Sequence, residues 1–425
     1  MTRFPPPGYS AHWPHMSARR RATPWWAAAR YMATDAATGE KIAPSVVLDF
    51  SGARYMPALS DAILFTRAGT ATYVDADGLI KTAAVDQPRF DHSTGRRGLL
   101  LEGPATNLLP DSGFASGLSG KVIGGAVTAI SGDYWSGASN NGVQFAAPAP
   151  ASYSGVFISP TAPASGSYCL SVFVVMDDGG APVFGSATGS APANDFCLAH
   201  QGATINPLTY NVQALAGGVY RVSAAYTATG SEAGFGVIKY NNANTRGFKA
   251  TGYQYEAGAF PTSYIPTAGA SATRPADKAQ LAEPVAALLR SGAASVLLQG
   301  EGIYSRSSFG SLLSGLNNSD YVIALSEAGN QVNVLGGQPL LNIGTTAQPL
   351  GDFGVTVGWD TDTIRGSYNS SAIASRAGPQ EADFSTVHIG RSPSGIFAPG
   401  LYYQLAIWPF CMADADLQAK AVAYA

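Results

Sequence analysis

Short runs of β-branched and aromatic residues, each followed by glycine, proline, asparagine or aspartate, recur through most of this chain. The runs over 168–176, 220–228 and 234–240 are typical, because each has the length of one strand and partly alternates apolar with polar residues. The 49 glycines and 27 prolines follow no strict period, which argues against a collagen-like or low-complexity chain. The pattern therefore predicts an all-β protein built from sandwiches or jelly rolls.

A chain of 425 residues is too long for one compact core, so we expect several domains. Two β-sandwich (jelly-roll) domains in tandem are predicted after an irregular N-terminal arm and a small β connector. The boundaries that we expect are an arm over 1–45, a connector or collar over 46–106, a jelly roll over 107–275, a helical linker over 276–292 and a second sandwich over 293–425.

Three local signals place individual elements. Asp77-Gly78 lies between two strand-like runs and predicts a tight hairpin. The last residues, 412–425, predict a closing helix, with acids near its start and a lysine nearer its end. Trp359 and Trp408 stand inside strong strand patterns, and we expect both in the core.

Charged residues make up only 12% of the chain, about half of the usual share. With a net charge of −3 the chain has no general attraction to nucleic acid, and we expect no nucleic-acid partner. No run is long and apolar enough for a membrane helix, so we expect no membrane insertion. The first residues lack the apolar core of a secretion signal, which predicts synthesis in the cytoplasm without a signal peptide. Abundant aromatic and uncharged polar residues suit neutral, hydroxyl-rich ligands.

The first thirty residues differ from the rest of the chain. They contain five arginines, three tryptophans and no acidic residue, without a sustained helical or strand period. We expect this segment to become ordered against a partner protein through its tryptophans and arginines, and a frayed tail is the alternative. The residues expected to anchor it are Trp13, Arg19, Arg20, Arg21, Trp25 and Trp26.

No pattern of catalytic residues stands out. The five histidines lack the spacing of metal ligands, and the chain contains neither a G-x-S-x-G nor an H-E-x-x-H motif. A glycosidase needs two carboxylates roughly 5–10 Å apart, whereas acids such as Glu301 and Glu327 lie near strand ends and are typical surface residues. We therefore expect a protein that is not an enzyme.

Three cysteines, Cys169, Cys197 and Cys411, are too few for a disulfide framework. We expect buried free thiols, and a bond between Cys169 and Cys197 is the alternative.

Two polar clusters with aromatic neighbours are candidates for sugar binding. A pyranose presents an apolar face to an aromatic ring, and its hydroxyls form hydrogen bonds with amide, carboxylate or guanidinium groups. Such groups commonly lie on loops of a sandwich or on one face of a sheet. The alternative is an ordinary polar turn beside a packed aromatic, and the loop over 315–321 is the equivalent in the last sandwich. The candidate residues are Tyr134, Trp135, Asn140 and Asn141 in the first cluster, and Tyr240, Asn241, Asn242, Asn244 and Arg246 in the second.

Three stretches resemble phage-encoded modules. The stretch over 62–109, with TR-x3-ATY-x-D-x2-G, PRFDH and GLLLEG-x2-TNLL, resembles the block upstream of adhesion domains in phage and prophage fibre and spike proteins. Residues 107–114 and 252–267 resemble the first and last strands of carbohydrate-binding jelly rolls. Residues 293–425 resemble concanavalin-type, laminin-G-like sandwiches. This domain order is similar to that of head spikes of bacterial gene transfer agents.

The resemblance implies an adhesion protein of a phage-like particle. It implies binding to host capsular or surface polysaccharide, attachment of the N-terminus to a capsid or tail (spike-base) protein, and release in an extracellular particle. Weak single sites gain from linkage, so we expect a homo-oligomer, either a trimer or a pentamer. A structural collar protein and a capsule depolymerase are the alternatives. No cofactor is expected, although related sandwiches hold structural calcium, for which Asp111 and Glu256 are the candidate ligands.

Overall fold

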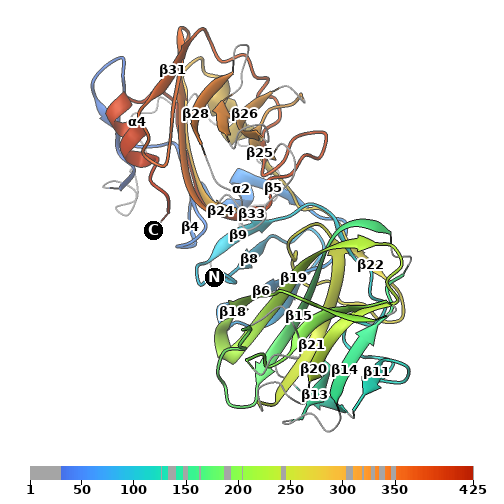
Figure 1. Ribbon diagram of the computed structural model, residues 1–425. Coiled ribbons are helices and arrows are strands. Elements are labelled where there is room, and N and C mark those ends of the chain that lie inside the picture. The colour runs from blue at the N-terminus through green and yellow to red at the C-terminus, as the bar shows by residue number, and fades with distance from the viewer. Residues whose placement is uncertain are drawn as a thin grey trace, which may run out of the picture.

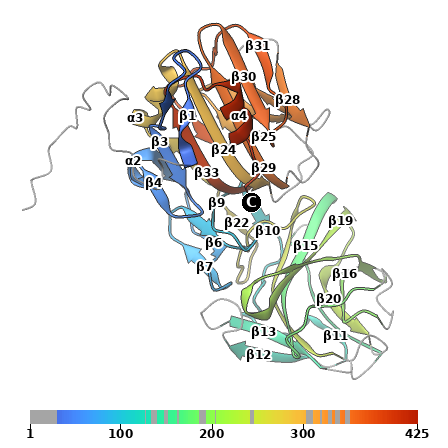
Figure 2. The same ribbon diagram turned by 90° about the vertical axis from the view of Figure 1, so that its left-hand side faces the viewer.

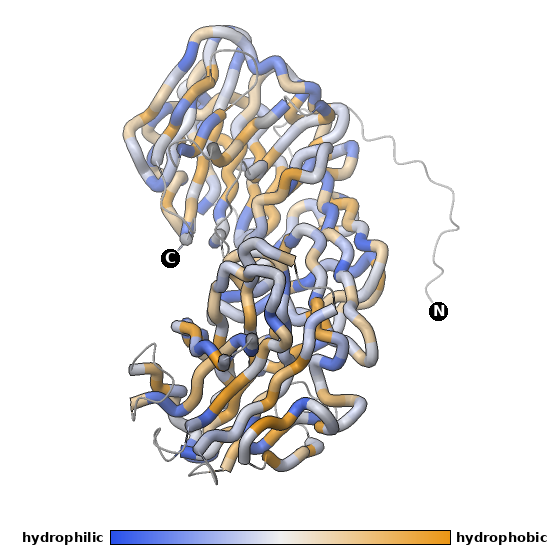
Figure 3. Tube along the Cα trace, turned by 45° about the vertical axis from the view of Figure 1, so that its right-hand side comes forward, coloured by the Kyte–Doolittle hydropathy of each residue, from blue (hydrophilic) through white to orange (hydrophobic). Residues whose placement is uncertain are grey.

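Two β-sandwiches, here called the middle and the terminal sandwich, make up the computed structural model (Figure 1). In Figure 1 the terminal sandwich, in orange and red, lies above the middle sandwich, in green and yellow. Figure 3 shows hydrophobic and hydrophilic residues interleaved along the strands, the pattern expected when one face of each sheet is buried. The all-β prediction is confirmed. The structure describes residues 30–125, 127–132, 140–146, 152–161, 164–185, 193–202, 204–240, 246–302, 310–317, 320–326, 331–334, 340–345 and 351–424.

Two antiparallel sheets form the middle sandwich, and its core contains Phe145, Val172 and Phe235. The five-stranded sheet consists, in order, of β11 (Val122–Gly124), β14 (Tyr153–Ile158), β20 (Gly234–Tyr240), β16 (Cys197–Gln201) and β17 (Ile205–Leu208). The six-stranded sheet consists, in order, of β12 (Thr128–Gly132), β13 (Asn140–Phe145), β21 (Phe248–Ala257), β15 (Ser165–Met176), β19 (Val219–Thr229) and β18 (Asn211–Ala214).

The terminal sandwich is larger and also antiparallel, and Trp359 lies in its core while Trp408 is buried in a smaller apolar cluster beside it, as predicted. One sheet consists of β31 (Ala374–Ala377), β30 (Thr363–Tyr368), β29 (Gly351–Trp359), β24 (Ala294–Gly302), β33 (Gly400–Trp408), β3 (Val46–Asp49) and β4 (Arg54–Met56), with β9 (Gly98–Leu101) pairing with both β33 and β8 (Arg89–Asp91). The other consists of β28 (Leu341–Thr345), β27 (Gln331–Val334), β26 (Tyr321–Ser326), β25 (Gly310–Ser314), β32 (His388–Ile389), β23 (Lys278–Leu281) and β5 (Ile63–Thr66).

The segment over 46–106 is not the separate connector that the sequence predicts. Its first strand, β3, is fully buried and pairs with β33, so that Val46 lies opposite Ile407. Its strand β5 extends the other sheet of the terminal sandwich by pairing with β23. A strand as short as β3, with three apolar residues and Asp49, cannot bury both of its faces alone. Joining an existing sheet pairs its backbone groups and covers its side chains. Figure 2 shows these blue strands against the terminal sandwich.

The expected helical linker over 276–292 is also corrected. Its first part is the strand β23, in which exposed or half-buried residues alternate with buried ones. Only α3 (Glu283–Ala286) and a following turn of 3-10 helix (Ala287–Arg290) are helical. Pro284 lies in the first turn of α3, where a proline is tolerated but does not allow the helix to extend backwards.

Residues 30–45 belong to the terminal sandwich, which shortens the predicted arm. Tyr31 is buried, and its carbonyl accepts a hydrogen bond from Trp408 Nε1 at 3.0 Å. The two-stranded ladder of β1 (Ala33–Thr34) and β2 (Lys41–Ile42) follows, and Asp416 of the closing helix accepts the Thr34 amide at 2.6 Å. That helix, α4 (Asp414–Lys420), is shorter than predicted. The predicted anchoring residues from Trp13 to Trp26 lie outside the described residues.

Smaller elements complete the fold. The predicted hairpin is present as β6 (Ala71–Val74) and β7 (Ile80–Ala83), with Gly78 in its turn at a φ of +78°, which favours glycine. Strands β10 (Ala105–Asn107) and β22 (Ala272–Arg274) pair where the chain enters and leaves the middle sandwich, and α2 (Leu59–Ala62) precedes β5. All three cysteines are free and buried, as predicted. Within the described part of the chain, no helix has the length and apolar character needed to cross a membrane.

Candidate functional site

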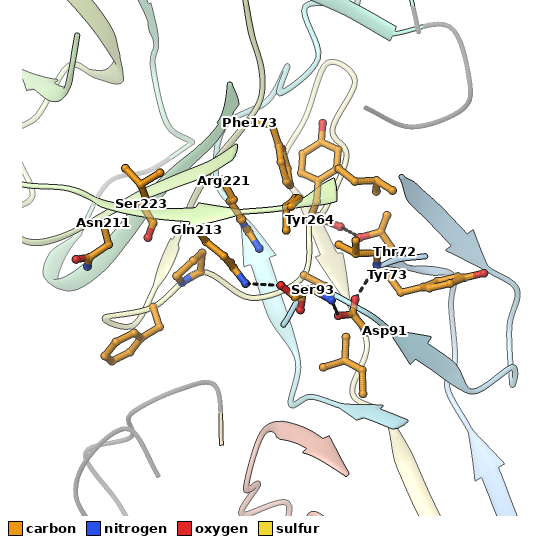
Figure 4. A pocket seen from close by; sticks show the side chains of 18 residues that line it. Thr72, Tyr73, Asp91, Ser93, Phe173, Asn211, Gln213, Arg221, Ser223 and Tyr264 are labelled. Atoms are coloured by element: carbon orange, nitrogen blue, oxygen red, sulfur yellow. Dashed lines mark hydrogen bonds between the residues drawn. The ribbon is translucent and has the colours of Figure 1, made fainter. Parts of the chain in front are cut away.

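A pocket of about 240 Å³ lies where the segment from β6 to β9 faces the six-stranded sheet of the middle sandwich (Figure 4). One wall comes from β15, β18 and β19, and the other comes from β6, β8 and the loop after β8. The turn after β21, with Phe260 and Tyr264, closes one side. The pocket therefore depends on two segments that are distant in the chain.

Four polar side chains line one wall in a regular array. In the antiparallel ladder of β18 and β19, Asn211 is opposite Ser223 and Gln213 is opposite Arg221. Alternate residues of a strand point to the same face, and Val222 between them belongs to the sandwich core. The array therefore faces away from the core and into the pocket. Because β18 is the exposed edge strand of its sheet, the array is open to solvent on one side.

Aromatic rings lie beside this array. Phe173 of β15 is directly opposite Arg221 in the next ladder, and the guanidinium carbon lies 5.2 Å from the centre of its ring. Tyr264 packs edge-to-face on Phe173, with ring centroids 5.7 Å apart. Phe173 is nearly fully buried, so Arg221 is held against a fixed surface.

The buried carboxylate of Asp91 fixes the backbone of the opposite wall by hydrogen bonds. Asp91 accepts hydrogen bonds from the amides of Val74 at 2.7 Å and Ser93 at 2.8 Å, and burial raises its pKa. The Ser93 carbonyl accepts a hydrogen bond from Gln213 Nε2 at 3.0 Å, which joins the two walls (Figure 4). Asp91 therefore positions the loop that closes the pocket.

The structure describes only part of the two clusters that the sequence favours. Tyr134, Trp135, Asn241, Asn242 and Asn244 lie outside the described residues.

The other four candidate residues belong to different elements. Asn140 and Asn141 begin β13 of the six-stranded sheet, and Asn141 is exposed. Tyr240 ends β20 of the five-stranded sheet, so the two clusters start from opposite sheets of the sandwich. Arg246 lies just before β21.

The contacts of Tyr240 and Arg246 are mainly structural. Tyr240 is half-buried and packs edge-to-face against Tyr153, with ring centroids 6.3 Å apart. Arg246 forms ion pairs with Asp178 at 2.6 Å and with Asp195 at 2.7 Å. These contacts tie the connection between β15 and β16 to the start of β21. A sugar contact by either residue stays a prediction.

The two candidate calcium ligands have separate partners. Asp111 accepts hydrogen bonds from Lys121 Nζ at 2.8 Å and from the amide of Ala115 at 2.7 Å. Glu256 accepts hydrogen bonds from the amide of Thr262 at 2.8 Å and from its hydroxyl at 2.6 Å. Among the described residues, no group of three or more His, Cys, Asp or Glu side chains is placed to hold a metal ion.

Sequence reasoning missed the array on β18 and β19 because it favoured loops. The signal was present in the alternation of Asn211 and Gln213 with apolar neighbours, which predicts a strand with one polar face. The pairing of Asn211 and Gln213 with Ser223 and Arg221 depends on the register of β18 and β19, and the alternation alone does not predict that register.

No family model matches this chain, and no curated protein matches it. Among solved structures, the Ruminococcus gnavus IT-sialidase CBM40 bound to alpha2,3 sialyllactose aligns at 15% identity over 33% of this chain and 88% of that chain, with a TM-score of 0.27. A Trypanosoma rangeli sialidase aligns at 10% identity over 33% of this chain and 25% of that chain, with a TM-score of 0.28. A structure titled a receptor binding domain aligns at 12% identity over 34% of this chain and 38% of that chain, with a TM-score of 0.25. TM-scores of this size establish no common fold.

Proposed function

We propose that this protein is a polysaccharide-binding adhesion protein and that the pocket beside β18 and β19 holds one sugar unit. The observation that carries the proposal is the array of Asn211, Gln213, Ser223 and Arg221 next to Phe173. Amide, hydroxyl and guanidinium groups complement the hydroxyls of a pyranose. The half-buried rings of Phe260 and Tyr264, which also line the pocket, offer an apolar surface to its C–H face.

The shape of the site suits a polymer more than a small metabolite. The pocket of about 240 Å³ is smaller than the roughly 300–1,000 Å³ of sites that enclose a drug-sized ligand. All four residues of the edge strand β18 are exposed, so a chain can continue from the pocket along this edge.

We further propose that the protein acts as a receptor-binding spike or fibre of a phage-like particle, either a virion or a gene transfer agent. The resemblance of the stretch over 62–109 to fibre and spike proteins supports this proposal. In this role the protein is made in the cytoplasm and released in an extracellular particle. Its N-terminal residues attach to a capsid or tail protein, it assembles as a trimer or a pentamer, and its ligand is host capsular or surface polysaccharide.

We propose a binding role and not catalysis. Glu301 and Asp352 are opposite each other in the ladder of β24 and β29, which makes them the carboxylate pair to consider for a glycosidase. Arg96 contacts both carboxylates, at 3.2 Å from Glu301, and Tyr403 donates a hydrogen bond to Glu301. The arginine occupies the space between them that a glycosidic bond would need.

The test is binding of the purified full chain to an array of bacterial capsular and O-antigen glycans, followed by calorimetry with the glycans that bind. Asn211→Ala is expected to weaken binding about two- to tenfold, the effect of one hydrogen bond, and Asn211→Ala with Gln213→Ala is expected to weaken it further. Thr128→Ala, on the opposite edge of the same sheet, is the control and should bind normally.

Three outcomes would count against this proposal. A folded protein that binds no glycan would favour a structural collar protein instead. Unchanged binding by the double variant would exclude this pocket as the site. Release of reducing sugar from a bound glycan would replace adhesion with depolymerase activity.

A further inference from the structure

We infer that the sugar unit held in the pocket carries a carboxylate, as in a uronic or sialic acid, and that Arg221 binds this carboxylate. The inference rests on the proposed function and specifies its ligand class.

Arg221 is a buried cation whose charge the protein leaves unpaired. Only 9% of the residue is exposed, and no carboxylate forms an ion pair with it among the described residues. Nη2 donates to the hydroxyl of Ser171 at 3.0 Å, while the buried Nε has no hydrogen-bond partner among the described residues. A buried charge is costly unless it is paired, so this arrangement is expected where a ligand supplies the opposite charge.

Two buried acids close to this site, Glu256 and Asp91, accept hydrogen bonds from other groups. Glu256 is bound by Thr262 and Gln254, and burial raises its pKa, which disfavours its charged form. Asp91 is bound by two backbone amides on the other wall. Arg221 lowers the pKa of Glu256 through its charge, but neither carboxylate forms an ion pair with the guanidinium.

The geometry around Arg221 suits a planar anion. Phe173 lies against the guanidinium at 5.2 Å and restricts its orientation, and a guanidinium offers paired N–H groups that match the two oxygens of a carboxylate. Figure 4 shows the side chain directed toward Gln213 and Ser93, which line the pocket.

The charge of the pocket favours a singly charged group over a phosphate monoester, which is largely dianionic at neutral pH. Arg221 is the one cationic side chain among the residues that line this pocket, and Asp91 lines the facing wall. The Arg221 guanidinium can balance one negative charge, so a carboxylate is matched by it, whereas a dianion carries a second negative charge that no other cation of the lining balances.

The experiment uses an array of glucuronate-, galacturonate- and sialate-containing glycans, each beside its methyl ester, together with sulfated dextran and neutral dextran. The full chain is expected to bind at least one acidic glycan about ten- to hundredfold more tightly than its ester. Arg221→Gln should remove this difference, so that the acid binds no more tightly than its ester. Arg221→Lys should keep part of it, because the charge remains and the paired donors are lost. Arg54→Gln, at an exposed position of the edge strand β4, is the control.

Equal binding of acid and ester, or tightest binding to sulfated dextran, would overturn the inference and leave glycan adhesion standing. Binding to no glycan at all would overturn both. If Arg221→Gln does not fold, the comparison of acid with ester on the unmodified chain still decides, because it needs no variant.

Discussion

The carboxylate of Asp277 lies 3.0 Å from the guanidinium of Arg67, and both side chains are fully buried although 210 residues separate them. Arg89 also donates to Asp277 and lies 2.8 Å from Glu102, which accepts two further hydrogen bonds from Ser263. These contacts join the segment that precedes the middle sandwich to the segment that follows it.

Replacing Asp277 with asparagine should therefore destabilise the protein strongly. The substitution removes the negative charge that pairs with both Arg67 and Arg89 in a buried site. Breaking a buried ion pair in this way typically lowers the free energy of unfolding by about 3–5 kcal/mol. Urea denaturation followed by intrinsic fluorescence measures this loss. Asp352→Asn, whose side chain is 43% exposed in its contact with Arg96, is the control and should cost less than about 1 kcal/mol. A loss below about 1 kcal/mol for Asp277→Asn would contradict the importance of this cluster.

Two truncations should separate the arm from the fold. Removal of residues 1–29 should abolish incorporation into particles, because the tryptophans and arginines predicted to anchor the protein lie in this segment. Removal of residues 1–45 should also lower the free energy of unfolding by about 2–4 kcal/mol. The reason is that Tyr31 is lost from the core and Trp408 Nε1 loses its hydrogen-bond acceptor. Calorimetry and a particle pull-down measure the two effects. Normal incorporation of the shorter truncation would contradict the anchoring role.

The cysteines should be almost unreactive in the folded protein. Burial raises the pKa of Cys169 to about 12 and the pKa values of Cys197 and Cys411 to about 11, so the thiolate is scarce at neutral pH. Ellman's reagent at pH 8 should label none of them within minutes, and all three after unfolding in urea. Rapid labelling of one thiol in the native protein would locate a segment that opens readily.

His388 should make the terminal sandwich less stable in acid. Burial and the nearby Arg391 lower the pKa of His388 to about 4, below its usual value of 6.5. Between these values the unfolded chain binds more protons than the folded one, so stability is full above about pH 6.5 and falls toward pH 4, by up to about 3 kcal/mol.

The matched variant for this effect is His388→Gln. It removes the titration, and the hydrogen bond with Gln280 at 3.1 Å can be re-formed by an amide. Unfolding curves of both proteins are measured from pH 7 to pH 4. Both proteins contain the same carboxylates, so the difference between their pH profiles of unfolding free energy reports the contribution of His388. Parallel pH profiles would show that His388 does not contribute.

Local features of the fold could be predicted from the sequence, and long-range pairings could not. The hairpin at Asp77-Gly78 and the burial of Trp359 follow from residue type and spacing within a few positions. The pairing of Val46 with Ile407 cannot be predicted in this way, because a short apolar strand is compatible with any open sheet edge. The same limit applies to the site, where Asn211 and Ser223 become neighbours only through the register of β18 and β19.

The sequence cluster around Trp135 is a competing candidate for the sugar site, and Trp135→Ala compared with Asn211→Ala can decide between this cluster and the pocket. If Trp135 stacks on a sugar, removing its ring should weaken glycan binding about ten- to hundredfold and leave the melting temperature unchanged, since one stacking ring contributes about 1–3 kcal/mol. If Trp135 is a structural residue, the substitution should instead cost about 3–5 kcal/mol of stability. The pocket on β18 and β19 predicts normal binding for Trp135→Ala and weakened binding for Asn211→Ala. Asn242→Ala should behave as Trp135→Ala does, because the competing site uses both residues. Loss of binding in these two variants, with normal binding by Asn211→Ala, would move the site from the sheet edge to Trp135 and Asn242.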